Sequence, residues 1–332
     1  MTDQTPPRRF FPPPRPLAPK PKPGLFRRVP PAIFPPILGV LGLGLIWRQS
    51  GWMFGLPDGV AEMFLGAMTL LWLFAVLAFA GKVLRRPGVL AEDLSILPGR
   101  AGVSALMMTV YQIAMVLGPY GGELARALLI GGLVLHLLLA LWIARKLASA
   151  PASQREVTPV WHLTFVGPIL GAVAAQMLGL EPLARVIFWL TLPLAAGIGA
   201  VSLVQIIRRV PPAPLRPLLA IHLAPLSLFG IVALGFGWTQ VALVFAALAV
   251  TVVLALVISL KWLLAARFTA LWGAFTFPLA AFARLVLGLV PGSPVGGAVL
   301  VLVTLIILPI LLRVMQDWVK GTLAARTNAA EA

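Results

Sequence analysis

One apolar stretch of the sequence, LWGAFTFPLAAFARLV (residues 271–286), holds residue types from which a gated ion pathway can be built. Phe277 directly precedes Pro278, and Arg284 follows seven residues after the aromatic. A phenylalanine ring can plug a narrow pore, and an arginine beside it can attract anions. The alternatives are that Phe277 packs against lipid or a neighbouring helix, and that Arg284 snorkels to the membrane interface.

The composition places the chain among membrane proteins. Of its 332 residues, 60% are hydrophobic and 11% are charged, whereas soluble domains are about half apolar and a quarter charged. Apolar runs recur between residues 33 and 316. Each run has about 18 or more residues, which is long enough for a transmembrane helix. These runs do not alternate apolar and polar residues, and this pattern excludes a transmembrane β-barrel.

These runs predict an all-α polytopic membrane protein with ten transmembrane helices. Very short connections, such as residues 235–238 and 290–297, imply antiparallel neighbours, so the helices are expected to form five helical hairpins. The predicted helices cover residues 31–48, 59–82, 97–118, 123–146, 159–179, 183–207, 215–235, 239–263, 268–289 and 296–316.

The basic residues predict the orientation in the membrane. All but four of the 26 lysines and arginines lie in the N-terminal tail, in the loops after even-numbered helices or at the C-terminus; the four are Arg48, Arg126, Arg185 and Arg284. Basic loops stay cytoplasmic, so both termini are predicted to be cytoplasmic in the inner (plasma) membrane. The net charge of +16 is therefore explained by basic loops that set the membrane orientation and contact anionic lipid, and not by binding to nucleic acid.

The two ends of the chain differ from its middle. Residues 1–30 are rich in proline and basic residues and predict a disordered cytoplasmic tail. Residues 31–317 form the predicted transmembrane channel domain, and residues 318–332 a short cytoplasmic C-terminal tail. A proline-motif partner site in the first segment is the alternative to a solvated tail near lipid.

A proline recurs early in each odd-numbered helix, at intervals of one helical hairpin. Small residues, Gly39 and Gly171 among them, stand three positions after four of the five prolines. A membrane proline kinks its helix and frees a carbonyl that protein or a water-filled cavity must satisfy. We therefore predict an inner ring of five proline-kinked helices around a central pore, the alternative being incidental prolines such as Pro193 and Pro309. The repeat prolines are Pro36, Pro98, Pro168, Pro225 and Pro278.

Other chemistry is not indicated. All ten acidic residues lie in loops, tails or helix ends, so no buried carboxylate is expected for proton or sodium coupling. The sequence has no phosphate-binding loop, metal-ligand constellation or nucleophile motif, so no enzyme activity, cofactor or metal site is predicted. His222, three residues before Pro225, is expected either to line the pore or to donate a hydrogen bond inside the bundle.

The motifs collected so far resemble those of one membrane family. WGAFTFPLAAFA (residues 272–283) resembles the ninth-helix motif of the tellurite-resistance/dicarboxylate-transporter family. VPPAIFPPILGVLGLGLIWR, FVGPILGAVAA and LRPLLAIHLAPLSLFGI are similar to its first, fifth and seventh helices. The resemblance covers residues 28 to 318, and the order of the motifs is more specific than any one of them.

The resemblance carries expectations about assembly and gating. It implies a homotrimer in which each protomer encloses its own pore of five inner helices, and it implies that Phe277 occludes that pore as its gate. Members of the family include bacterial TehA, the yeast malate permease, the fungal sulfite exporter and the plant guard-cell slow anion channels, and they pass small inorganic or organic anions. Arg284 is not a position that the resemblance assigns.

The sequence is therefore interpreted as a TehA-like anion channel of the inner membrane, with a link to tellurite resistance. A secondary transporter for sulfite or for C4-dicarboxylates such as malate is the first alternative. A membrane scaffold that recruits partners through its basic tail is the second.

Overall fold

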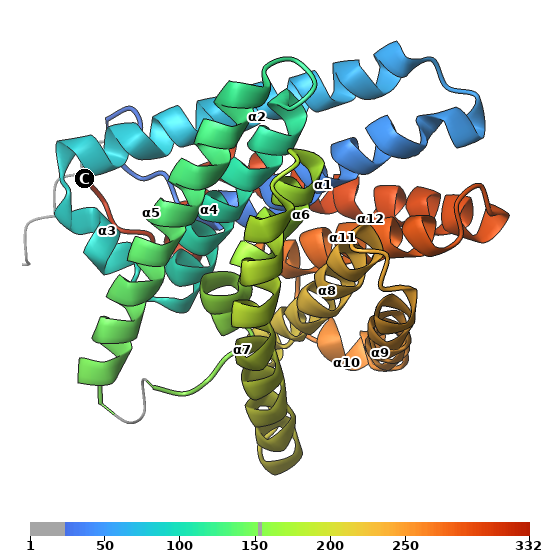
Figure 1. The fold of residues 1–332 in the computed structure, drawn as a ribbon. Helices are drawn as coiled ribbons and strands as arrows, with labels where there is room; N and C mark the ends of the chain where they lie inside the picture. The colour runs from blue at the N-terminus through green and yellow to red at the C-terminus, as the bar shows by residue number, and fades with distance from the viewer. Residues whose placement is uncertain (1–23, 152–154) are drawn as a thin grey trace, which may run out of the picture.

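The structure is a computed structural model, and it describes residues 24–151 and 155–332. Within these residues the chain is helical and contains no β-strand (Figure 1). Most of the predicted tail, residues 1–23, lies outside the described part. The elements are η1 (Pro31–Ile33), α1 (Phe34–Ser50), η2 (Gly51–Phe54), α2 (Asp58–Arg85), α3 (Gly88–Asp93), α4 (Leu97–Leu117), α5 (Gly122–Ser149), η4 (His162–Val166), α6 (Pro168–Met177), α7 (Glu181–Arg208), η5 (Ala213–His222), α8 (Leu223–Gly235), α9 (Thr239–Ile258), α10 (Leu260–Leu263), η6 (Ala270–Phe275), α11 (Thr276–Leu289), α12 (Pro294–Val319) and α13 (Thr322–Arg326).

The apolar helices are those of a multi-pass membrane protein. In the described part of the chain, nine helices are long and apolar enough to cross a bilayer. The segment His162–Met177 is apolar as well but shorter. The predicted ends of the helices agree with the observed ones to within a few residues, except that α9 ends at Ile258 and the short α10 follows it.

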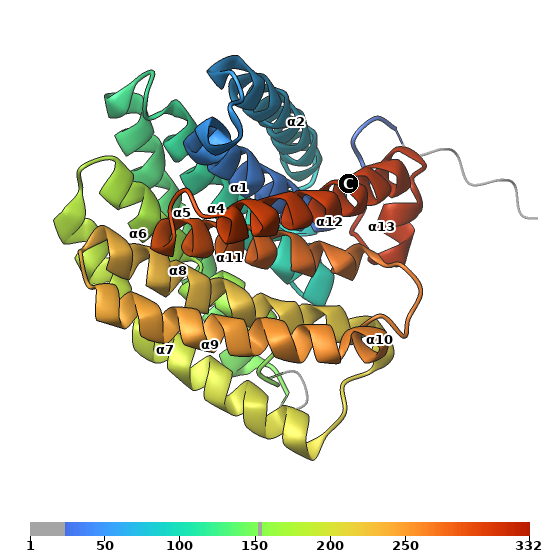
Figure 2. The ribbon, with the colours of Figure 1, turned by 90° about the vertical axis from the view of Figure 1, so that its right-hand side faces the viewer.

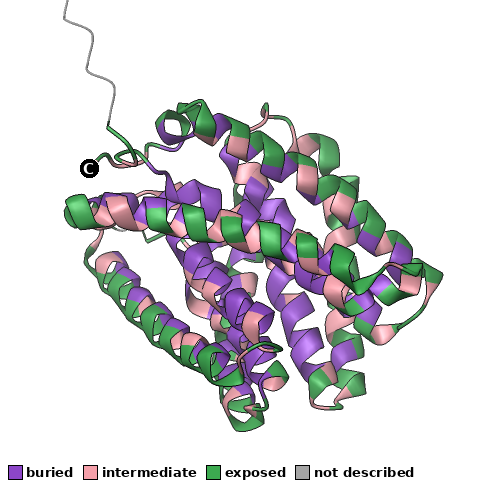
Figure 3. Ribbon diagram, turned by 90° about the horizontal axis from the view of Figure 1, so that it is seen from above, coloured by how far each residue is buried: buried purple, intermediate pink, exposed green. Residues whose placement is uncertain are grey.

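Burial divides the helices into two classes. In the 18-residue apolar windows of Pro31–Phe54, Leu97–Leu117, Ala213–Gly235 and Ala270–Leu289, between 61% and 78% of residues are buried. In the other five long helices the buried share is between 11% and 39%. Figure 3 shows the difference, with purple helices enclosed by helices whose outer faces are green. Apolar helices with an exposed outer face are what a lipid environment requires.

These four helices and α6, in which residues 169–175 are buried, contact one another in a closed sequence, and we call the five the inner helices. Helix α1 packs against α4 and α11, α11 against α8, α8 against α6, and α6 against α4. Each of these helices also packs against the long helix that follows it in the chain, as α8 does with α9 and α11 with α12 (Figure 2). Every inner helix therefore has two inner neighbours and packs against the outer helix that follows it in the chain.

The repeat prolines lie where the helix type changes. In four repeats a 3-10 or π-helical segment leads into the α-helix that carries the proline: η1 into α1, η4 into α6, η5 into α8 and η6 into α11. Helix α4 instead begins directly at Leu97, after the extended residue Ile96. A proline in the first turn of an α-helix removes an N–H that has no intrahelical partner there. The sequence predicts a kinked helix at each of these prolines. In four repeats the structure has a change of helix type just before the proline.

A close approach of two inner helices fixes the start of α11. A Cβ added to Gly39 would lie 2.3 Å from the Cβ of Thr276 and 2.8 Å from its carbonyl carbon, so only glycine allows α1 and α11 to approach so closely. The Thr276 hydroxyl donates to the carbonyl of Gly273 at 2.7 Å and to that of Pro35 at 3.1 Å. Carbonyls freed at the junction are thereby satisfied by protein, as a membrane environment demands.

The π-helical segment η4 is supported in a similar way. The Nε2 atom of His136, on α5, lies 3.1 Å from the carbonyl oxygens of both Leu163 and Thr164. Its Nδ1 atom lies 2.9 Å from the hydroxyl of Tyr111. Because carbonyls only accept, Nε2 carries the proton and Nδ1 accepts from Tyr111. This histidine, which is fully buried, therefore ties three helices together.

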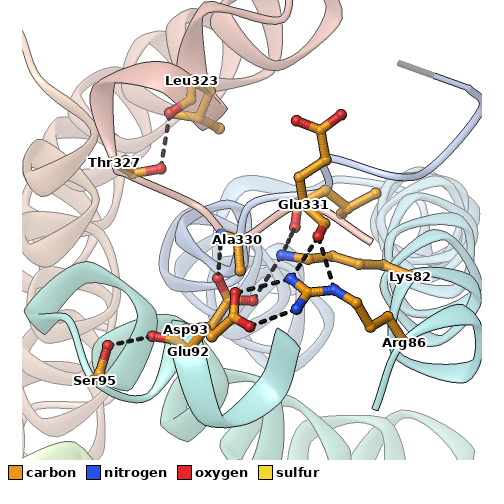
Figure 4. Close-up of polar contacts among 10 residues, drawn as sticks. Lys82, Arg86, Glu92, Asp93, Ser95, Leu323, Thr327, Ala330 and Glu331 are labelled. Carbon is orange, nitrogen blue, oxygen red and sulfur yellow. Dashed lines mark hydrogen bonds and ion pairs between the residues drawn. The ribbon is translucent and has the colours of Figure 1, made fainter. Parts of the chain in front are cut away.

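The two ends of the described chain meet at one end of the bundle, which we call the terminal face. There the Nζ atom of Lys82 donates to a carboxylate oxygen of Asp93 at 2.7 Å and to the carbonyl of Val29 at 3.0 Å. The other oxygen of Asp93 accepts from the backbone N–H of Ala330 at 2.8 Å. We name this group of Val29, Lys82, Asp93 and Ala330 the terminal clamp; Figure 4 shows Lys82, Asp93 and Ala330 coming together.

A more exposed ion pair borders the terminal clamp. The Arg86 guanidinium donates to both carboxylate oxygens of Glu92, at 2.5 and 2.8 Å, and to the carbonyl of Glu331 (Figure 4). This hydrogen bonding holds the pKa of the Glu92 carboxyl below its usual value. Further out, the N–H of Ala332 donates to the carbonyl of Arg27. The C-terminal residues are thus fastened to the segment that enters α1.

Candidate functional site

The inner helices enclose a small cavity on the side of the terminal face. Apolar residues from η1, α1, α4, η4, η5, η6 and α11 form its wall, and the cavity has a volume of about 30 Å³. Three prolines, Pro35, Pro98 and Pro278, belong to it, and we call it the proline-side cavity. Water needs about 10–15 Å³ of such space, so the cavity has room for very few molecules.

A second small cavity lies further along the same helices. Gly42, Gln112, Arg284 and Phe277 line it, together with apolar residues of α1, α4, α6, α8 and α11. Its volume is about 20 Å³. We call it the arginine-side cavity. All five inner helices contribute to its wall, which places it on the inside of the closed sequence of contacts.

Phe277 separates the two cavities. It is the one residue, among those that the structure describes, that lines both of them. Its side chain is buried, with 4% of its surface exposed. A Cβ added to Gly42 would come within 3.7 Å of the phenylalanine ring, so the glycine leaves room beside the ring's edge. The ring therefore stands between the two cavities, at the position that a path joining them would cross.

Arg284 points into the bundle from the same helix. Its two terminal nitrogens contact the sulfur atoms of Met115 on α4, at 3.9 Å, and Met177 at the end of α6, at 3.5 Å. Thioether sulfurs are weak acceptors. No carboxylate in residues 24–151 or 155–332 lies within salt-bridge distance of this guanidinium.

Gln112 is a polar member of the arginine-side cavity that the sequence analysis does not single out. Its side chain is 1% exposed, and its amide oxygen has no hydrogen-bond partner within the described structure. A Cβ added to Gly42 would lie 3.0 Å from its amide nitrogen. A glutamine in the middle of an apolar helix was the available signal, because an amide in a membrane must find a partner.

The predicted prolines and glycines divide between two positions. Pro98 and Pro278 line the proline-side cavity, whereas Pro36, Pro168 and Pro225 belong to the walls of neither cavity. Gly39 packs against Thr276, as described above. Gly171 faces outward, because a Cβ there would lie 2.9 Å from the side chain of Leu133 on α5. Both glycines serve the packing between helices, and neither lines a cavity.

His222 lies beside a partner that its sequence spacing does not reveal. Its Nδ1 atom is 2.9 Å from the Nε2 atom of His162, and the two rings meet edge to face. The pair joins η4 to η5 and lines neither cavity. The remaining ring nitrogens, Nδ1 of His162 and Nε2 of His222, are buried without a partner in the described structure.

One expectation about acidic residues needs correction. Asp93 does lie at the end of a short helix, as the sequence indicates, but its side chain is fully buried. A buried carboxylate therefore exists, contrary to the prediction, because the C-terminal residues and α2 cover α3. It is held by Lys82 and Ala330 and lines neither of the two inner cavities. In the described part of the chain, no group of three or more His, Asp or Glu residues could hold a metal.

Comparison with known proteins identifies the family. The family model for voltage-dependent anion channels matches residues 28–315, and the chain belongs to that family. This agrees with the resemblance in the sequence motifs and supports anion transport across a membrane in general terms. No curated protein matches the chain.

Proposed function

We propose that this member of the voltage-dependent anion channel family conducts small anions through a pore between its five inner helices, closed in the present conformation by Phe277. The observation that carries the proposal is the position of Phe277 as the residue common to both inner cavities. The cavities hold about 30 and 20 Å³, so the path between them is shut. Turning or withdrawing one aromatic ring would join them.

The proposal extends to the architecture and its placement. We count the short segment His162–Met177 as the tenth span, which makes five hairpins, each with one inner and one outer helix. Basic residues concentrate in the tails and in the loops at the terminal face, so that face is placed in the cytoplasm and the chain in the inner (plasma) membrane. A homotrimer with one pore in each protomer is proposed from the sequence resemblance.

The lining supports anions over cations. The proline-side cavity has only apolar lining, and the arginine-side cavity adds one cation and one amide. A pore with positive charge and apolar constrictions favours anions. The sequence resemblance also suggests a role in tellurite resistance. The alternative function that it suggests is a carrier for sulfite or a C4-dicarboxylate. Measuring anion current against uptake driven by a pH gradient distinguishes a channel from a carrier.

The test is the anion current of Phe277→Ala in planar bilayers. Removing the ring should raise the chloride current by an order of magnitude or more, because Phe277 is the residue that the linings of the two cavities share. Phe282→Ala is the matched control, since this residue lies on the same helix and lines neither cavity; its current should equal that of the wild type. Phe277→Leu gives a second variant if truncation to alanine impairs folding.

Two results would overturn the proposal. One is an unchanged or reduced current in folded Phe277→Ala, which would remove the gate. The other is uptake of anions driven by a pH gradient without accompanying current, which would make the protein a carrier.

A further inference from the structure

We infer that the arginine-side cavity is a resident binding site for one small inorganic anion, held by Arg284 and Gln112 while Phe277 closes the pore. The inference rests on the proposed function for its place on a conduction path. The site itself is argued from the groups that line it.

The Arg284 guanidinium supplies the charge. It carries five N–H donors and no acceptor, and its neighbours Met115 and Met177 offer only weakly accepting sulfurs. A charge within a transmembrane segment is costly and ordinarily pairs with an opposite charge or lines a cavity. Arg284 does line a cavity, about five residues and hence roughly 8 Å from the end of α11.

The other arginines on this side of the bundle have partners of their own. Arg48 donates to both oxygens of Glu62, at 2.5 and 2.7 Å. Arg126 pairs with Glu123 at 2.8 Å. The Arg185 guanidinium lies over two aromatic rings, 5.0 Å from that of Phe236 and 5.6 Å from that of Trp238. The contrast indicates that the partner of Arg284 is an ion that comes from solution.

Gln112 is the second, independent observation. Its side chain is 99% covered, it lines the cavity, and its amide oxygen is unpartnered within the described structure. An anion cannot satisfy the acceptor oxygen, but a half-turn of the terminal amide exchanges this oxygen for the NH2 group, which donates to an anion. Gly42 gives the amide nitrogen space at the cavity wall, where a larger residue would press on it. The nitrogen is thereby available as a neutral donor to the same anion.

The size of the cavity sets the class of anion. A volume of about 20 Å³ admits one occupant not much larger than water. A halide fits this description, and a four-carbon dicarboxylate does not. No acidic side chain lines the cavity to repel an anion. Chloride is therefore the expected occupant, and bromide, which is slightly larger and scatters X-rays anomalously, is its probe.

Bromide binding to the purified full chain tests the inference. Crystals soaked in bromide should show an anomalous peak between Arg284, Gln112 and the Phe277 ring. In a bromide titration, Arg284→Gln should weaken binding about tenfold to a hundredfold, the effect of losing a hydrogen bond to a charged group. Gln112→Leu should weaken it by a smaller factor than Arg284→Gln, because the amide donates a hydrogen bond to the anion but carries no charge of its own.

Arg313→Gln is the matched control. It removes a positive charge from an exposed position on α12 and should leave bromide affinity unchanged. Arg284→Lys keeps the positive charge but replaces the planar guanidinium with an ammonium group. This variant should bind bromide with an affinity between those of the wild type and Arg284→Gln. An absent peak in the wild type overturns the inference, and so does a peak or affinity that Arg284→Gln leaves unaltered.

Failure of the site and failure of the proposed function are distinguishable. Bromide occupancy is measured in the closed protein and requires no current. If bromide binds and Phe277→Ala carries no current, the anion site is supported and the gate is rejected. If Phe277→Ala conducts and no bromide peak appears, the pore is supported and the anion site is rejected.

Discussion

Two cations inside the described helix bundle, the buried Lys82 and the partly buried Arg284, lie in very different surroundings. Lys82, in the terminal clamp, is fully covered and donates to a carboxylate and a backbone carbonyl. Arg284, which lines the same cavity as Phe277, contacts two methionine sulfurs. Burying a charge is tolerated when it is paired and hydrogen-bonded. Lys82 has protein partners, so its charge stabilises the fold. Arg284 contacts weak acceptors, and we propose that its charge binds the permeating anion.

The largest expected effect is at the paired site. Asp93→Asn removes the negative charge and leaves the ammonium of Lys82 buried without compensation. Unfolding of the purified protein in detergent should show a loss of about 3–5 kcal/mol. The chloride current per folded molecule should not change, because the clamp lines neither cavity. A loss below about 1 kcal/mol, the range of surface pairs, would contradict the structural role assigned to the clamp.

The smallest expected effect is at its exposed neighbour. Arg86 and Glu92 keep 44% and 52% of their side-chain surface exposed, so solvent screens their attraction. Glu92→Gln should leave the stability at neutral pH almost unchanged and so serves as the control for Asp93→Asn on the same short helix. The pKa of Glu92 is lowered in the folded protein, so its contribution is present above the carboxyl's usual pKa and is lost as the pH falls below it.

The comparison also shows which features the sequence predicts. Membrane helices are predicted well because hydropathy depends on composition over some 20 residues, and α4 is found at Leu97–Leu117 where residues 97–118 were expected. The four long helices with the highest burial each carry a repeat proline, while the arrangement of ten helices in five hairpins stays a prediction. Phe277 is singled out by its place before a repeat proline and by the family motif.

Contacts between distant helices are the part that the sequence does not predict. The partner of His222 is His162, and Asp93 becomes buried only when the C-terminal residues fold over it. Gln112 and Arg284 line the same cavity although they are far apart in the chain. Such pairings depend on the rotation and depth of each helix, and apolar helices with few polar positions carry little information about either.

The most direct measurement neutralises Lys82 and Arg284 in turn and follows two properties of each variant. Lys82→Met and Arg284→Met should be compared in unfolding stability and in the chloride-to-sodium permeability ratio, the second in a Phe277→Ala background that conducts. The account predicts that Lys82→Met lowers stability by about 3–5 kcal/mol and leaves the permeability ratio unchanged. Arg284→Met should keep or raise stability, because it fills a site between two methionines, and should lower the preference for chloride. If Arg284→Met destabilises the protein while the permeability ratio stays the same, Arg284 belongs to the fold and the distinction between the two cations is wrong.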